Sequence, residues 1–384
     1  MSMKKFTKKM LAIVAAAVMT MGLAMPAFAS ETGTGERPKV TDAYISKTYN
    51  TEVAKKLTFK FTATQVKTGN GVNIPDHPIT IPDIAFATPK IGSNTAVSKI
   101  DFGAKFTKGG EYVYEVKENE QSDPAVAETA HEKLLMSQAE YTMHVYVIED
   151  KGAFKIDNII VNKKKDDKGT ELAGKVDNIG DNADTNTFRF VNTYVQEAGT
   201  GIKPTEPGND YTKYGSLNVS KTVVNALTKA AQSFTFTANF TFPTGTDATT
   251  LKGVKANGTD ITNQLNSGYT FKLENGGNMK FTGLPVGTTI AVTETATPKY
   301  EGSAAVIING EKGETFTADG YNKDLSVSGK KLGQNRNEVD VTNTYDNVPT
   351  TGIIMNTLPY VLMVALCGVA LVAFVASKRR KVQK

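Results

Sequence analysis

The chain of 384 residues is 40% hydrophobic and 22% charged, which is typical of globular protein and suggests two or three domains. Disulfides are excluded by the single cysteine, and the histidines His77, His131 and His144 lack the partners and spacing of a zinc site, so we expect no metal and no cofactor. The net charge of +5 comes from nine basic residues in the N-terminal and C-terminal segments of the chain. Without these segments the chain has 35 basic and 39 acidic residues, and this mildly acidic body excludes a nucleic-acid partner.

Residues 1–29 have the order of a secretory signal peptide. Four lysines precede an apolar stretch that begins at Met10, and an Ala-Phe-Ala cleavage site ends at Ala29. A retained membrane anchor is the alternative, but the small-residue site follows the apolar stretch at once. We therefore expect the mature chain to begin at Ser30 and to be secreted.

Segments of alternating apolar and polar residues fill the body of the chain and predict an all-β fold. Thr, Val, Phe and Tyr dominate these segments, as half-buried strands prefer. Only Ala125–Gln138 could form a short helix. Many short strands with frequent turns favour Ig-like β-sandwiches. The clearest strand-like runs are Leu57–Phe61, Tyr141–Val147, Phe234–Phe240 and Ile290–Val292, and the hairpin dipeptides are Asn70-Gly71, Asn257-Gly258 and Asn309-Gly310.

The two halves of the body share one tripeptide near their beginning and another at their end, which predicts a duplicated domain. Ser-Lys-Thr ends at Thr48 in the first half and at Thr222 in the second. Asn-Thr-Tyr closes the halves at Tyr194 and Tyr345. The glycines and two prolines between the halves suit a semi-rigid linker. The predicted boundaries are 38–196 for the first β-sandwich, 197–214 for the linker and 215–347 for the second β-sandwich.

In each half, a lysine, a glutamate and an asparagine interrupt an apolar strand face. Side chains share a face at every second residue, so Lys47 lies in phase with Ala43 and Ile45. The alternative is that each polar residue falls at a strand end, where a lysine stem covers apolar surface and its amine reaches water. Repetition in both halves favours a common purpose, because burying charges is costly. The six residues are Lys47, Glu118 and Asn192 in the first half and Lys221, Glu294 and Asn343 in the second.

Such a triad has the chemistry to form an intramolecular isopeptide bond. Burial lowers the pKa of a lysine and raises the pKa of a glutamate, so a neutral amine and a protonated carboxyl group coexist near neutral pH. The amine then attacks the asparagine amide, while the glutamate donates a hydrogen bond to the amide oxygen and transfers protons to the departing ammonia. We expect this autocatalytic step alone and no enzyme activity. The expected bonds are Lys47–Asn192 with Glu118 and Lys221–Asn343 with Glu294.

Residues 348–384 resemble the sorting signal of Gram-positive surface proteins, usually Leu-Pro-x-Thr-Gly. An apolar stretch from about Leu358 to Ala376 follows the motif and is long enough to span a bilayer in the precursor, before a basic tail. The resemblance implies that a sortase cleaves between Thr351 and Gly352 and anchors the protein covalently to cell-wall peptidoglycan. The motif residues are Val348, Pro349, Thr350, Thr351 and Gly352, with Val in the usual place of Leu.

The body resembles the FctA-type streptococcal backbone pilins, which consist of two Ig-like, CnaB-like domains that each form such a bond. The resemblance covers roughly residues 40–352 and is most specific in Tyr112–Glu118, Phe190–Tyr194 and Gly283–Glu294. It implies the shaft subunit of a cell-surface pilus, which a sortase joins head to tail to copies of itself, with minor pilins as further partners. A monomeric wall-anchored adhesin or stalk protein is the alternative.

One departure from that family concerns the lysine that accepts the next subunit. In the family this lysine lies just upstream of the first-domain asparagine, whereas residues 184–187 contain none. The nearest candidate lysines are Lys163, Lys164, Lys165, Lys168 and Lys175.

A tethered hydrolase is a third possible function, which no Gly-x-Ser-x-Gly or His-Glu-x-x-His motif supports. The sequence leaves open whether the protein has a shaft, base or tip position and whether it binds a host ligand.

Overall fold

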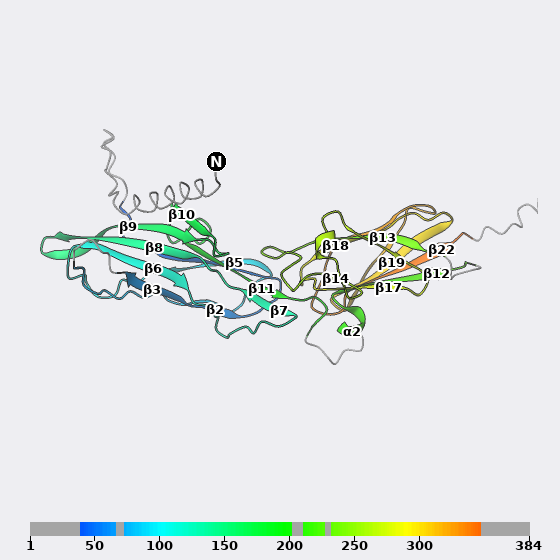
Figure 1. Cartoon of the computed structure of the whole chain (residues 1–384), viewed down its shortest axis with the longest axis horizontal. Coiled ribbons are helices and arrows are strands. Elements are labelled where there is room, and N and C mark those ends of the chain that lie inside the picture. Colours follow the sequence, from blue (N-terminus) through cyan, green and yellow to red (C-terminus); the bar gives the residue numbers. More distant parts are fainter. Residues whose placement is uncertain (1–38, 67–72, 202–209, 227–231, 347–384) are drawn as a thin grey trace, which may run out of the picture. The chain divides into compact units, whose positions relative to one another are not determined.

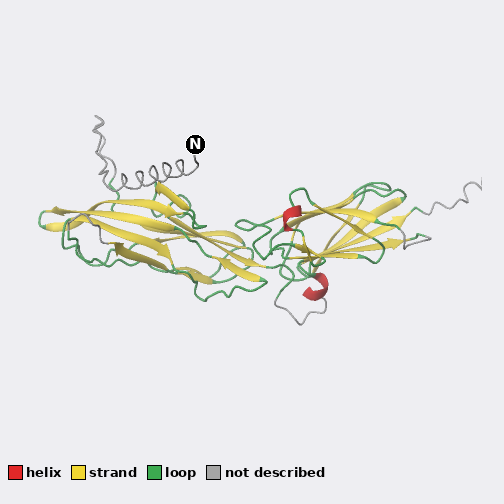
Figure 2. Cartoon of the chain, in the orientation of Figure 1, coloured by secondary structure: helices red, strands yellow, loops and turns green. Residues whose placement is uncertain are grey.

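In each half of the body, β-sheets pack around a separate hydrophobic core (Figure 1). The computed structural model describes residues 39–66, 73–201, 210–226 and 232–346. Strands make up almost all of its regular structure (Figure 2), which confirms the predicted all-β fold class. No helix in these ranges has the length and apolar character needed to span a membrane. The predicted signal peptide, the sorting signal and the Asn70-Gly71 turn lie outside the described residues.

The first core lies between a four-stranded and a five-stranded sheet. Its strands are β1 (Tyr44–Thr51), β2 (Leu57–Phe59), β3 (Phe61–Val66), β4 (Ile84–Phe86), β5 (Gly92–Lys99), β6 (Gly110–Glu118), β7 (Glu132–Leu135), β8 (Glu140–Asp150), β9 (Ala153–Lys165), β10 (Glu171–Lys175) and β11 (Arg189–Gln196). One sheet has the order β5-β1-β11-β7 and the other β10-β9-β8-β6-β3, with β2 and β4 as a separate pair. The first and last strands, β1 and β11, pair in parallel, with Lys47 opposite Phe190.

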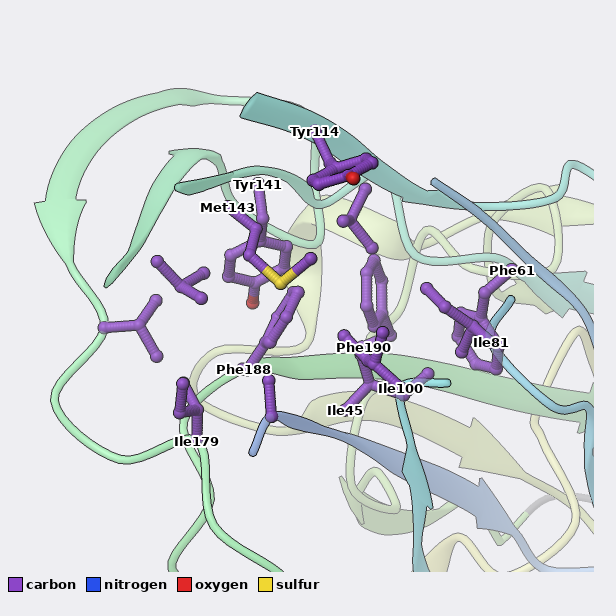
Figure 3. Close-up of a cluster of buried hydrophobic side chains, with 14 of the residues drawn as sticks. Ile45, Phe61, Ile81, Ile100, Tyr114, Tyr141, Met143, Ile179, Phe188 and Phe190 are labelled. Carbon is purple, nitrogen blue, oxygen red and sulfur yellow. The ribbon is translucent and has the colours of Figure 1, made fainter. Parts of the chain in front are cut away.

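Aromatic side chains from both sheets fill this core (Figure 3). The Tyr141 ring of β8 lies 4.7 Å from the Phe188 ring and 5.2 Å from the Phe190 ring, measured between centroids. Such aromatic pairs contribute about 0.5–1.5 kcal/mol beyond their buried area. Phe188 and Phe190 are two residues apart, so this contact depends on the alternation that the sequence displays.

Strand β1 departs from simple alternation, because both of its faces are buried. Its outer face is covered by the chain that precedes β11. The Ser46 hydroxyl donates to the Ala183 carbonyl at 3.0 Å, and the Asn186 side chain donates to the Tyr44 carbonyl at 2.8 Å. These bonds satisfy the Ser46 hydroxyl and the Tyr44 carbonyl on a strand that carries one of the predicted site residues.

The second core lies between a seven-stranded and a four-stranded sheet. Its strands are β12 (Leu217–Val224), β13 (Phe234–Thr241), β14 (Lys255–Ala256), β15 (Thr259–Asp260), β16 (Tyr269–Leu273), β17 (Asn278–Thr282), β18 (Thr289–Glu294), β19 (Tyr300–Ile308), β20 (Glu311–Thr317), β21 (Leu325–Lys331) and β22 (Glu338–Tyr345). The orders are β15-β14-β17-β12-β22-β19-β20 and β16-β13-β18-β21. Again the first and last strands, β12 and β22, pair in parallel.

Two of the predicted hairpin turns join neighbouring strands of the second core. Asn257-Gly258 connects β14 to β15, and Asn309-Gly310 connects β19 to β20. Both residues of each turn have positive φ, at 45° and 86° in the first and 55° and 81° in the second. Asn and Gly tolerate this left-handed conformation, which two-residue hairpin turns require.

The helix predicted for Ala125–Gln138 is wrong. Residues 125–131 have no regular structure, and β7 follows them as a strand. This strand pairs antiparallel with β11, with Leu134 opposite Tyr194. Pairing along the sheet edge therefore overrides the weak helical propensity of the segment. The described helices are α2 (Tyr211–Tyr214) and a short 3-10 helix (Thr262–Gln264).

The stretch predicted as a linker begins inside the second core. Ala198 is fully buried there, and its N–H donates to the Leu284 carbonyl at 2.9 Å. The Glu197 carboxylate is also buried and accepts hydrogen bonds from the Ser216 hydroxyl at 2.7 Å and the Gly283 N–H at 2.5 Å. Residues 197 and 198 are therefore fixed to the second domain rather than free between the domains, while residues 202–209 lie outside the described ranges.

Candidate functional site

The structure brings the six predicted site residues together as two triads, one in each core. In the first triad, Lys47 lies on β1 and Asn192 on the neighbouring strand β11. Glu118 reaches them from the end of β6 in the other sheet. Lys47 and Asn192 are 0% exposed and Glu118 is 8% exposed. This burial excludes the strand-end interpretation, in which the lysine amine reaches water.

A single carboxylate oxygen of Glu118 contacts both partners of the predicted bond. Its Oε1 atom lies 2.6 Å from Lys47 Nζ and accepts a hydrogen bond from Asn192 Nδ2 at 2.9 Å. The Phe59 ring, with its centroid 4.4 Å from Nζ, covers the amine on another side. Sharing one oxygen holds the amine beside the amide and gives a short proton path between the two nitrogens.

The orientation of the Asn192 amide differs from the expectation. Its Oδ1 atom accepts a hydrogen bond of 2.7 Å from the backbone N–H of Ser137. A backbone N–H can only donate, so the oxygen must face Ser137 and the NH₂ group must face Glu118. The expected hydrogen bond from a protonated glutamate to the amide oxygen is therefore wrong for the first triad. Glu118 instead contacts the nitrogen that would leave as ammonia.

The second triad repeats the arrangement on β12, β22 and β18. Lys221 Nζ lies 3.2 Å and 3.3 Å from the two carboxylate oxygens of Glu294. Asn343 Nδ2 donates to Glu294 Oε1 at 2.5 Å. All three residues are at most 3% exposed, and the Phe234 ring centroid lies 4.2 Å from the amine. Here too, the glutamate reaches across the core from the sheet opposite the lysine and the asparagine.

Burial shifts the titration of both lysine–glutamate pairs toward their neutral forms. It lowers the pKa of Lys47 and of Lys221 to about 8, although attraction to the neighbouring glutamate acts in the opposite direction. Burial also raises the pKa of Glu118 and of Glu294 above the usual range, again against the attraction of the lysine. Each site therefore favours a neutral amine and a protonated carboxyl group far more than water does.

Three residues at the first triad escaped the sequence analysis. Ser137 holds the amide oxygen, and Met136 Sδ lies 3.3 Å from Asn192 Nδ2. Asp167 accepts hydrogen bonds from the Ser137 hydroxyl and from the N–H of Val191. The first two lie in the segment expected as a helix, and Asp167 lies in a charge run typical of a solvated loop. No pattern in the sequence distinguishes them.

The candidate lysines for joining subunits fall into two groups. Three are in ion pairs, Lys163 with Asp167 at 3.8 Å, Lys164 with Glu115 at 3.0 Å and Lys165 with Glu140 at 3.0 Å. The other two, Lys168 and Lys175, are exposed, as is Lys164.

Residues 215–345 match a family model described as a domain of unknown function, DUF7601. This match spans the second sandwich and about a third of the chain. A search of curated proteins found no match.

Among solved structures, the chain is similar to the major pilin of Streptococcus pyogenes, at 19% identity and a TM-score of 0.30, covering 80% of this chain and 99% of that one. A mutant of that pilin aligns at 18% identity and a TM-score of 0.31, with coverage of 79% and 99%. A Mobiluncus mulieris adhesin containing intramolecular disulfide, isopeptide and ester cross-links aligns at 13% identity and a TM-score of 0.23, with coverage of 76% and 85%.

Proposed function

We propose that the protein is a self-cross-linking structural subunit of a bacterial surface fibre, the shaft pilin of a sortase-assembled pilus. The observation that carries the proposal is the repeated triad. Each core buries a lysine, a glutamate and an asparagine in contact, and the lysine and asparagine lie on the first and last strands of their domain. An intramolecular Lys–Asn isopeptide bond would join these two strands covalently in each domain.

The bond forms by aminolysis of the asparagine side chain. The neutral Nζ of Lys47 attacks Cγ of Asn192, a new C–N bond forms, and the Cγ–Nδ2 bond breaks to release ammonia. Glu118 Oε1 touches both nitrogens, so the glutamate can accept the proton that Nζ loses and supply the proton that Nδ2 gains. The carboxyl group ends in the state in which it began. Lys221, Glu294 and Asn343 perform the same step in the second core.

This proton relay predicts a plateau in the pH dependence of bond formation. The neutral pair and the ion pair contain the same number of protons, so the reactive fraction is constant between the pKa values of the two groups. We expect the rate of ammonia loss to be level through neutral pH and to fall above about pH 8, where the lysine is neutral but the glutamate has lost its proton. It falls again at acid pH, below the raised pKa of the glutamate.

The measurement uses chain recovered unfolded from inclusion bodies, diluted into buffers of different pH and followed by intact mass. A rate that keeps rising above pH 8 would show that the glutamate acts only as a base and not as a proton donor.

Assembly is tested on the bacterial surface. A shaft subunit joined through the sorting motif at Thr351 should give a ladder of large covalent species on denaturing blots of wall extracts. Deleting the pilin sortase should collapse the ladder to monomer. A single wall-linked monomer band in the wild type would support the alternative, a monomeric adhesin or stalk. The exposed lysines Lys168 and Lys175 are the first acceptors to replace with arginine.

A further inference from the structure

The amide oxygen of the reacting asparagine has a hydrogen-bond donor in the first core but none in the second. Asn192 Oδ1 accepts the Ser137 N–H at 2.7 Å, and Ser137 is itself 7% exposed. Asn343 Oδ1 is buried as well, yet no donor reaches it from any residue that the structure describes. Attack by a lysine amine pushes an electron pair of the C=O bond onto this oxygen. The two sites therefore differ at the atom where negative charge develops.

Asp167 holds the Ser137 donor in place. Its Oδ1 atom accepts the Ser137 hydroxyl at 2.6 Å and the N–H of Val191, the residue before Asn192, at 2.8 Å. Its backbone carbonyl accepts the N–H of Gln138 at 3.1 Å. One residue thus joins the segment that carries the donor to the strand that carries the amide.

The turn that presents Asp167 is itself well ordered by hydrogen bonds. The neighbouring Asp166 carboxylate accepts the N–H groups of Lys168 at 2.9 Å and Thr170 at 2.8 Å. The free oxygen of Asp167 faces Lys163, whose Nζ lies 3.8 Å away. Because both of these side chains are partly exposed, at 28% and 22%, this ion pair contributes little to stability. Asp167 therefore acts mainly through the two hydrogen bonds that its Oδ1 atom accepts from Ser137 and Val191.

We propose that the backbone N–H of Ser137 is the oxyanion donor for isopeptide formation in the first domain, and that Asp167 is the positioning residue that aims it. The inference rests on the proposed function. As Nζ of Lys47 adds to Cγ of Asn192, Oδ1 gains negative charge, and the Ser137 N–H stabilises it. When the C=O bond re-forms, Cγ–Nδ2 breaks and ammonia leaves with the proton relayed by Glu118. Removing one such donor typically costs about 10²–10³-fold in rate.

The second domain of the same chain provides an internal reference rate for bond formation. Unfolded chain is refolded by dilution, and ammonia loss is followed by intact mass, with peptide mapping to assign it to each domain. In the parent chain we expect the first bond to form faster than the second. Asp167→Ala should slow the first bond by at least tenfold and leave the second unchanged.

Asp167→Asn is the matched rescue variant, because its side-chain oxygen still accepts both hydrogen bonds. The negative charge of Asp167 raises the pKa of both Lys47 and Glu118, so its loss changes both pKa values in the same direction. We expect Asp167→Asn to retain most of the parent rate. Ser137→Pro, which deletes the donor itself, should slow the first bond at least as much as Asp167→Ala.

Folding is checked separately in a Lys47→Ala background, where the first bond cannot form. A purely structural role for Asp167 predicts that Asp167→Ala lowers the melting temperature of that chain and that the rate of the first bond falls only as far as the folded fraction falls. Formation of the first bond at the parent rate in folded Asp167→Ala and Ser137→Pro chains would overturn the inference and leave the proposed function standing. A parent chain that loses no ammonia would instead overturn the proposed function.

Discussion

The mass of a recombinant chain of residues 30–347 is expected to lie two ammonia molecules below the value calculated from its sequence. Each triad supplies one, because Lys47 and Lys221 each contact a glutamate that also contacts the asparagine to be attacked. Lys47→Ala or Lys221→Ala should lose only one ammonia. Glu118→Ala and Glu294→Ala should do the same, because the proton relay is removed while both partners of the bond remain.

The control for this measurement is a lysine outside both triads. Lys55 forms an ion pair with Glu132 at 3.0 Å, and both side chains are about a third exposed. Lys55→Ala should therefore retain the full deficit of two ammonia molecules. A wild-type mass equal to the calculated value would reduce the triads to buried ion pairs and remove the basis of the proposed function.

Thermal stability should fall markedly when either bond is prevented. A cross-link between Lys47 and Asn192 closes a loop of 145 residues, and one between Lys221 and Asn343 closes a loop of 122 residues. By analogy with disulfides, loops of this length stabilise a domain by on the order of 5 kcal/mol. For domains of this size, that corresponds to a decrease in melting temperature of about 10–20 °C. Scanning calorimetry of Asn192→Ala and Asn343→Ala measures it.

Asparagine variants are preferred for this experiment because they leave the lysine–glutamate ion pair intact. Glu118→Ala would also leave a buried lysine without its ion-pair partner, which lowers the stability of the domain further. Each substitution should move the transition of its own domain, since the two hydrophobic cores are separate clusters. Equal melting temperatures for Asn192→Ala and the wild type would contradict a covalent bond in the first domain.

The β-sandwich fold and the members of both triads could be predicted from the sequence for the same reason. Strand side chains alternate with a fixed period, so a lysine in phase with Ala43 and Ile45 must enter the core, as the structure shows for Lys47. The repetition of the pattern around Lys221 distinguished it from chance. The burial of the outer face of β1 could not be predicted, because it depends on a loop more than 130 residues away in sequence.

The parts of the first site that sequence analysis missed depend on the backbone or on tertiary contacts. Every residue except proline has an N–H, so nothing in the sequence marks that of Ser137 as the donor to Asn192. Asp167 lies among lysines and acids, where most side chains face solvent, and only the folded turn directs it to Ser137. The amide orientation of Asn192 follows from that donor and therefore could not be inferred from residue types alone.

The parallel pairing of the first and last strands has a mechanical consequence for a fibre built from this chain. Tension would enter the second domain at the start of β12 and leave it at the end of β22, and because these two strands are parallel it would load the pair in shear. With the second bond formed, the force would pass directly from Lys221 to Asn343, and the residues enclosed by that loop would carry none. In the first domain, an acceptor such as Lys168 lies inside the loop from Lys47 to Asn192, so the residues between the acceptor and Asn192 would carry force. Only residues 193–220 would lie between the two bonds. These 28 residues can extend to about 90–100 Å, whereas the second bond would prevent the residues between Lys221 and Asn343 from extending at all.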